Sequence, residues 1–292
     1  MLTVGLRRML WVAALLVLAE ALPLTVLSGQ TDRYFAWTID VPVTAAFLGA
    51  AYLAAGVLEG FAARQRAWSR ARLAVPGVWV FTTLTLLVTV THLDAFHLAA
   101  TSPVTWAVTW AWVAVYATVP PVLGVLWWRQ LRAVRGQRPA PGDHLPSALR
   151  HALGAQGLVM AGAGGLLLAR PDHAGWWPWP LTVLTARAVG AWLVGLAVLA
   201  LQAWWTDRLD ATTVVFAAGA VLGVGQLVVV ARFLDSFGWG DPAAWTYTAF
   251  VASIAAVGLG GTAAARRARG SPVTPGKATD DLLGEAGPAR SC

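Results

Sequence analysis

Two charged side chains lie deep inside apolar segments of this chain, and they are its first candidates for chemistry. Glu20 follows Arg8 by twelve residues, which places it roughly 18 Å along a helix. Arg187 follows Trp179 by eight residues, or roughly 12 Å. Charges inside a bilayer are costly, so each requires a partner or a role. Because the two depths overlap, we predict that Glu20 and Arg187 approach each other, either as an anion or carboxylate site built on Arg187 or as a structural ion pair.

An acid is repeated at the ends of two other segments. The string Leu-Asp-x-Phe occurs at 93–96 and again at 234–237, and it places Asp94 and Asp235 alike. Residues three apart share one face of a helix, which predicts that Asp235 pairs with Arg232 and that Asp94 pairs with His97. The two acids either cap the next helix or contribute to an outer-facing site. The predicted ligand-binding residues are Arg187, Glu20, Asp94, Asp235, Arg232 and Thr185.

His92, Asp94 and His97 form a string that could supply two or three ligands to zinc or copper. Residues five apart on a helix point about 140° away from each other, so the spacing is poor and we predict no metal site. No cofactor is indicated. Glu59 lies at the end of an apolar segment near several arginines, which predicts a surface ion pair. The sequence contains no phosphate loop and no G-x-S-x-G elbow, so an enzyme is the less favoured class.

The composition requires lipid as the main solvent for these residues. Hydrophobic residues make up 58% of the 292 positions and charged residues only 12%, whereas a soluble domain carries about 25% charged residues. A helix needs roughly 20 apolar residues to cross a bilayer. Eight stretches qualify, which predicts an all-α integral membrane protein with transmembrane helices at Met9–Leu27, Pro42–Phe61, Val75–Phe96, Val104–Trp127, Ala152–Ala169, Leu181–Trp204, Thr212–Leu234 and Ala243–Ala264.

The basic residues predict the orientation of these helices. Almost all of them fall on one side if Arg7 and Arg8 are cytoplasmic, and the opposite loops then hold only Arg33 and Arg170. Both termini are therefore expected in the cytoplasm. The excess of arginine over lysine is typical of a GC-rich bacterial genome, which predicts a bacterial plasma membrane. A cleaved signal peptide ending near Ser28 is the alternative for the first segment, but the segment is longer than a typical signal core.

The chain also contains an internal repeat. Besides the two Leu-Asp-x-Phe strings, Trp37 with its following Thr-Ala and Gly-Ala pairs recurs as Trp179 with the same pairs, at a similar offset. Each copy holds four spans, so the copies are expected to be parallel, as two four-helix repeats (4+4). The predicted divisions are a first repeat with the start of a linker at 1–138, a second repeat at 139–268 and a disordered cytoplasmic tail at 269–292.

No motif in the sequence names a substrate. The duplication favours a carrier or small-molecule binding protein with an outer-facing site between the repeats. The short loops suit an alternative, a non-catalytic partner or sensor subunit, and the histidine string suits a third, a lipid- or quinone-linked membrane enzyme. The expected partners are the lipid bilayer, a small-molecule or lipid ligand and another membrane protein. The basic residues are dispersed, which argues against nucleic acid.

Overall fold

The computed structural model describes residues 1–137 and 142–270, and this part of the chain is helical. The long helices are α1 (Val4–Val26), α3 (Pro42–Arg64), α5 (Ala74–Thr91), α6 (Pro103–Ala133), α7 (Ser147–Ala169), α8 (Val183–Thr206), α9 (Leu209–Arg232) and α10 (Pro242–Gly270). Between them lie two short α-helices and three 3-10 helices, which are α2 (Thr31–Tyr34), α4 (Trp68–Ala71), η1 (Leu93–Ala95), η2 (Pro171–Trp176) and η3 (Leu234–Ser236).

Eight helices in the described ranges are long and apolar enough to cross a membrane, which confirms the predicted number of spans. Even the shortest, α5, has 18 residues and extends about 27 Å. The predicted bounds differ at the helix ends. The span expected to run to Phe96 stops at Thr91, so Asp94 lies in η1 instead of the helix. The last helix continues to Gly270, while residues 138–141 and the rest of the predicted tail, 271–292, lie outside the described residues.

Local sequence signals set several helix ends. Proline occupies the first turn of α3 and of α6, where its missing N–H costs nothing. Thr182 and Thr185 form a reciprocal capping box at the start of α8. That helix ends at Asp207, whose backbone is left-handed with φ 49° and ψ 45°. Aspartate tolerates this conformation better than most residues, and it turns the chain directly into α9.

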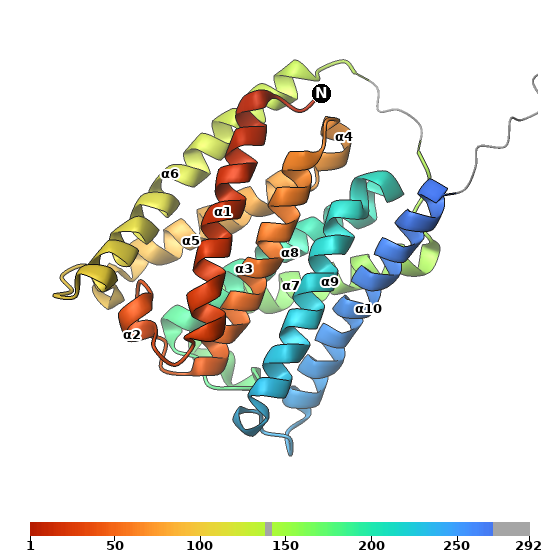
Figure 1. Ribbon diagram of the computed structural model, residues 1–292. Coiled ribbons are helices and arrows are strands. Elements are labelled where there is room, and N and C mark those ends of the chain that lie inside the picture. The colour runs from red at the N-terminus through yellow and green to blue at the C-terminus, as the bar shows by residue number, and fades with distance from the viewer. Residues whose placement is uncertain (138–141, 271–292) are drawn as a thin grey trace, which may run out of the picture.

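The eight long helices form two layers of four (Figure 1). One layer has the order α1, α3, α9, α10, and the other has the order α6, α5, α8, α7. The most closely packed pairs are all neighbours within a layer. Across the layers, α1 meets α6, α3 meets α5, α9 meets α8 and α10 meets α7, but these pairs touch more sparsely. The space between the layers is therefore filled mainly by side chains.

Small residues allow the close packing within a layer. A Cβ atom added to Gly164 of α7 would lie 2.9 Å from the carbonyl oxygen of Gly190 in α8, and the reverse addition gives the same distance. Close backbone approach of this kind is how helices associate when lipid offers no hydrophobic drive between them. The central helices α3 and α8 are the most buried of the eight.

The helix bundle has two ends, a terminal face and a distal face. At the terminal face α1 begins and α10 ends, and at the opposite, distal face lie α2 and the three 3-10 helices (Figure 1). Both described ends of the chain thus lie at one end of the bundle.

Candidate functional site

Arg187 lies in α8 near the distal face, and its partner is a histidine. Its Nη1 atom is 3.1 Å from Nε2 of His92, which follows α5. The other ring nitrogen of His92, Nδ1, is 2.9 Å from the carbonyl oxygen of Val88. Both contacts are satisfied together when Nδ1 carries the proton and Nε2 accepts from Arg187. This bond joins the two repeats that the sequence predicts.

The expected approach of Glu20 to Arg187 is wrong, because no ion pair joins them in the described part of the chain. The reason is tertiary. Glu20 is half-buried on α1, which packs against α3 and α6, whereas Arg187 lies on α8, which packs against α7 and α5. Equal depth in a membrane does not place two helices side by side.

The duplicated acids are exposed and lie in equivalent 3-10 turns. Asp94 is in η1 and Asp235 is in η3, and neither forms an ion pair within the described ranges. The predicted pair of Asp235 with Arg232 is wrong, because the Arg232 guanidinium donates to the carbonyl oxygen of Thr25 instead. The following helices are capped by other residues. Ser102 accepts from the backbone at the start of α6, and Asp241 accepts from Ala243 at the start of α10.

The remaining predicted residues also have local roles. Thr185 completes the capping box of α8 and is buried. His97 contacts the Thr38 hydroxyl at 3.0 Å and the Phe35 carbonyl, not Asp94. In the described residues no group of three potential ligands is close enough to hold a metal ion, so His92, Asp94 and His97 do not come together. Because the helix ends at Thr91, these three residues do not share one helical face.

A buried carboxyl group that the sequence placed at the surface lies in the bundle interior. Glu59 of α3 is only 2% exposed. Its Oε2 atom is buried and has no hydrogen-bond partner among the described residues. The predicted surface ion pair is therefore wrong. Glu59 is five residues from the end of its helix, or about 8 Å, but it lies on the buried face of α3, while Phe61 and Arg64 are exposed.

Glu59 lines a central cavity of about 100 Å³ between the two layers. All eight long helices contribute to its walls, which are mostly apolar. Among these lining residues Glu59 is the only one with a carboxyl or basic group. The size is close to that of engineered apolar cavities, of about 150 Å³, that bind benzene.

The other polar residues of the central cavity have partners. Thr82 donates to the Val78 carbonyl oxygen of its own helix at 2.9 Å. The hydroxyl groups of Tyr116 and Tyr52 are 2.6 Å apart. The Gln156 amide donates to the Ser253 hydroxyl at 3.1 Å. Glu59 therefore presents an acceptor that the described part of its chain does not satisfy, and buried acceptors of this kind require a ligand, water or proton.

A signal for Glu59 was present in the sequence. The residues three and four positions away from it in α3 are small, and they are Ala55, Gly56, Ala62 and Ala63. The larger Val57 and Phe61 lie on the opposite side of the helix. A helix face of small residues packs closely against its neighbours, so a charge on that face points into protein.

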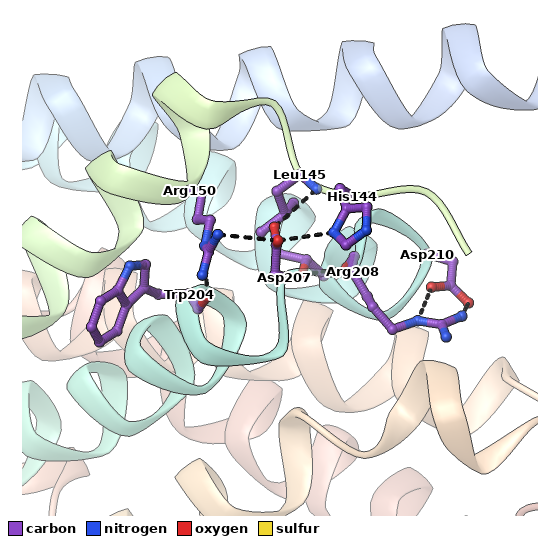
Figure 2. A network of polar contacts seen from close by, with 8 residues as sticks. His144, Leu145, Arg150, Trp204, Asp207, Arg208 and Asp210 are labelled. Carbon is purple, nitrogen blue, oxygen red and sulfur yellow. Dashed lines mark hydrogen bonds and ion pairs between the residues drawn. The ribbon is translucent and has the colours of Figure 1, made fainter. Parts of the chain in front are cut away.

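A separate polar network lies at the terminal face and is shown in Figure 2. The carboxylate of Asp207 accepts from the His144 ring at 2.9 Å, from Arg150 at 3.2 Å and from the backbone N–H of Leu145 at 3.2 Å. The hydrogen bond from His144 outweighs partial desolvation and holds the pKa of Asp207 below its usual value of 3.8. The network fastens the segment before α7 to the turn between α8 and α9.

Comparison with known proteins identifies no family for this chain. No protein-family model matches the chain, and no curated protein or solved structure shows significant similarity to it. The eight apolar helices fit a polytopic membrane protein.

Proposed function

We propose that this protein is a carrier or small-molecule binding protein of a membrane, and that it holds its ligand in the central cavity beside Glu59. The observation that carries the proposal is a buried carboxyl group that has no partner among the described residues and lines a mostly apolar cavity. Burial of such a group costs about 1–3 kcal/mol, which a purely structural core would avoid. Costly polar groups in membrane helices are commonly functional.

The cavity chemistry favours a small apolar ligand with one cationic group. The walls offer apolar side chains and a single acid, so a primary amine would place its ammonium group on Glu59 and its hydrocarbon part against the walls. A carboxylate ligand would meet repulsion there. The volume of about 100 Å³ suits an amine of a few carbon atoms.

The internal repeat supports a carrier. Equivalent aromatic residues of the two copies pack alike. The ring centroids of Trp37 and Phe96 are 5.2 Å apart in the first copy. Those of Trp179 and Phe237 are 5.3 Å apart in the second copy. The packing of α1 on α3 also corresponds to that of α7 on α8. We propose two parallel four-helix repeats, with the cavity between them, as in transporters that bind substrate at a repeat interface. The termini are proposed to be cytoplasmic, in a bacterial plasma membrane.

The outer-facing site predicted from the sequence is the second location to consider. Arg187 would recognise an anion, whereas Glu59 would recognise a cation, so the charge of the bound ligand separates the two. Arg187 already donates to His92, which leaves the cavity as the better supported site.

Binding of fluorinated four-carbon compounds to the purified protein in lipid nanodiscs tests the proposal. Trifluorobutylamine should bind, as seen by fluorine NMR, while the matched alcohol should bind more weakly and trifluorobutyrate should not bind. The variant Glu59→Gln should weaken amine binding by about 2–5 kcal/mol, because it removes one partner of a buried charge pair. The control variant Asp235→Asn, an exposed acid, should bind normally.

Equal binding of the amine to Glu59→Gln and to the unaltered protein would refute the cavity site. Binding of butyrate that is lost in Arg187→Ala would favour the outer site instead. Transport of labelled amine across the membrane of proteoliposomes then distinguishes the possible classes of protein. A carrier moves the amine across the membrane, whereas a sensor or partner subunit binds it without transport.

A further inference from the structure

A second cavity, named here the α7–α10 groove, leads from the distal face toward the central cavity. It has a volume of about 410 Å³ and lies between the distal halves of α7 and α10. Its lining includes Val159, Ala163, Trp176, Trp177, Thr246 and Phe250. Val159 is 53% exposed and Trp176 is 39% exposed, so the groove opens on the outside of the bundle, where lipid would lie.

The α7–α10 groove and the central cavity share part of their walls. Met160, Leu196, Leu222 and Ile254 line both. These four flexible or branched apolar side chains are therefore the barrier between the two spaces. Beside them the hydrogen bond from Gln156 to Ser253 ties α7 to α10. Each of the four apolar side chains borders a cavity on two sides, which gives it room to change rotamer, so this barrier can open without moving a helix.

The opposite lateral edge of the bundle, between α1 and α6, is closed at the corresponding place near the distal face. There α1 and α6 take the positions that α7 and α10 hold in the second repeat, and the short helix α2 packs against both α1 and α6. The Thr105 hydroxyl of α6 donates to the Arg33 carbonyl oxygen of α2 at 3.0 Å. In the second repeat η2 packs against α7 and α8 instead, and its last residue, the exposed Trp176, lines the α7–α10 groove without closing it.

The groove has the same charge preference as the central cavity. Asp241 has the only carboxyl group among the described residues that line it, and these include no arginine, lysine or histidine. Trp177 is 8% exposed and its Nε1 atom has no hydrogen-bond partner in the described part of the chain. The groove thus combines apolar walls with one acid at its rim, the chemistry that a small apolar amine requires.

We propose that the α7–α10 groove is the route by which a small apolar amine passes from the bilayer to the central cavity. This inference rests on the proposed function, because it names the path to the same site. The barrier of Met160, Leu196, Leu222 and Ile254 opens for each passage, and the ligand then reaches Glu59.

Filling the groove tests the route in nanodiscs with trifluorobutylamine as the probe. Ala163→Trp fills the groove from α7, and Thr246→Trp fills it from α10, so one variant remains if the other does not fold. Each should slow association and dissociation by about tenfold or more and leave the dissociation constant nearly unchanged, because a blocked path raises the barrier in both directions. Fluorine NMR exchange measurements give both rates. The control Ala155→Trp, on an exposed position of α7, should exchange like the unaltered protein.

The outcomes separate the route from the function. If Glu59→Gln weakens binding while both groove variants exchange as fast as Ala155→Trp, the route is wrong and the cavity site stands. A second result is that a groove variant changes the dissociation rate and the dissociation constant by the same factor, with no change in the association rate. The groove is then a binding site and not a path, which also overturns the route. If trifluorobutylamine does not bind to the unaltered protein, the proposed function fails and the route fails with it.

Discussion

Glu59 and Gln226 are equally buried, but they differ in their hydrogen bonds. We therefore predict that the same substitution changes the free energy of unfolding in opposite directions at these two positions. Each is 2% exposed. The Glu59 carboxyl has no partner among the described residues. The Gln226 amide donates to the Phe47 carbonyl oxygen at 3.0 Å and accepts from the Tyr247 hydroxyl at 3.0 Å. Methionine replaces either side chain with little change in volume.

Glu59→Met should stabilise the protein, and Gln226→Met should destabilise it. An unsatisfied buried polar group costs about 1–3 kcal/mol, so removing the Glu59 carboxyl should raise the free energy of unfolding by about that amount. Gln226→Met leaves the buried Tyr247 hydroxyl without its acceptor, so the free energy of unfolding should fall by a similar amount, about 1–3 kcal/mol.

Reversible unfolding in mixed micelles, followed by tryptophan fluorescence, measures both changes. A more stable Glu59→Met variant that no longer binds amine would show the exchange of stability for function that is common at binding sites. A loss of more than about 1 kcal/mol in Glu59→Met would refute the reasoning, because the carboxyl would then have a stabilising partner. The Gln226→Met control shows that the assay detects a broken buried bond.

Three further predictions concern bonds and packing elsewhere. Tyr52→Phe and Tyr116→Phe should each lower the free energy of unfolding by about 1 kcal/mol, and the double variant should lose no more than a single one, because both remove the same hydrogen bond. Asp207→Asn should be less stable than the unaltered protein above pH 3.8. The difference should shrink as the pH falls below 3.8 through the lowered pKa of folded Asp207, because protonation then removes the same charge. Gly164→Ala should destabilise by about 1–3 kcal/mol, because the new Cβ would press on the Gly190 carbonyl oxygen and on Leu193.

Each of these predictions has its own contradicting result. Additive losses in the double tyrosine variant would show that the two hydroxyl groups act through different partners. A pH-independent difference between Asp207→Asn and the unaltered protein would show that the charge of Asp207 is not what stabilises the turn. Gly162→Ala is the control for Gly164, since nothing lies within 4 Å of its added Cβ. Equal unfolding free energies for the two glycine variants would contradict the close approach of α7 and α8.

The candidate site could be predicted only in part. The capping role of Thr185 follows from its spacing to Thr182, but the sequence assigned it to a ligand. The shared Leu-Asp-x-Phe pattern predicts equivalent positions for Asp94 and Asp235, and both lie in equivalent 3-10 turns. Position along the helix alone predicts Glu59 at the surface, but it is buried, because distance from a helix end does not determine distance from water.

The sequence by itself determined how many apolar helices this protein has and roughly where each begins and ends. Those properties depend on length and composition, because a helix must cover the hydrocarbon thickness and its backbone bonds are satisfied within it. Only the tertiary structure decided which helices are neighbours, that Arg187 meets His92 and that Glu59 faces a cavity. The lateral order of apolar helices rests on many small contacts between shapes, such as that of Gly164 with Gly190, and no single stretch of sequence encodes both sides of such a contact.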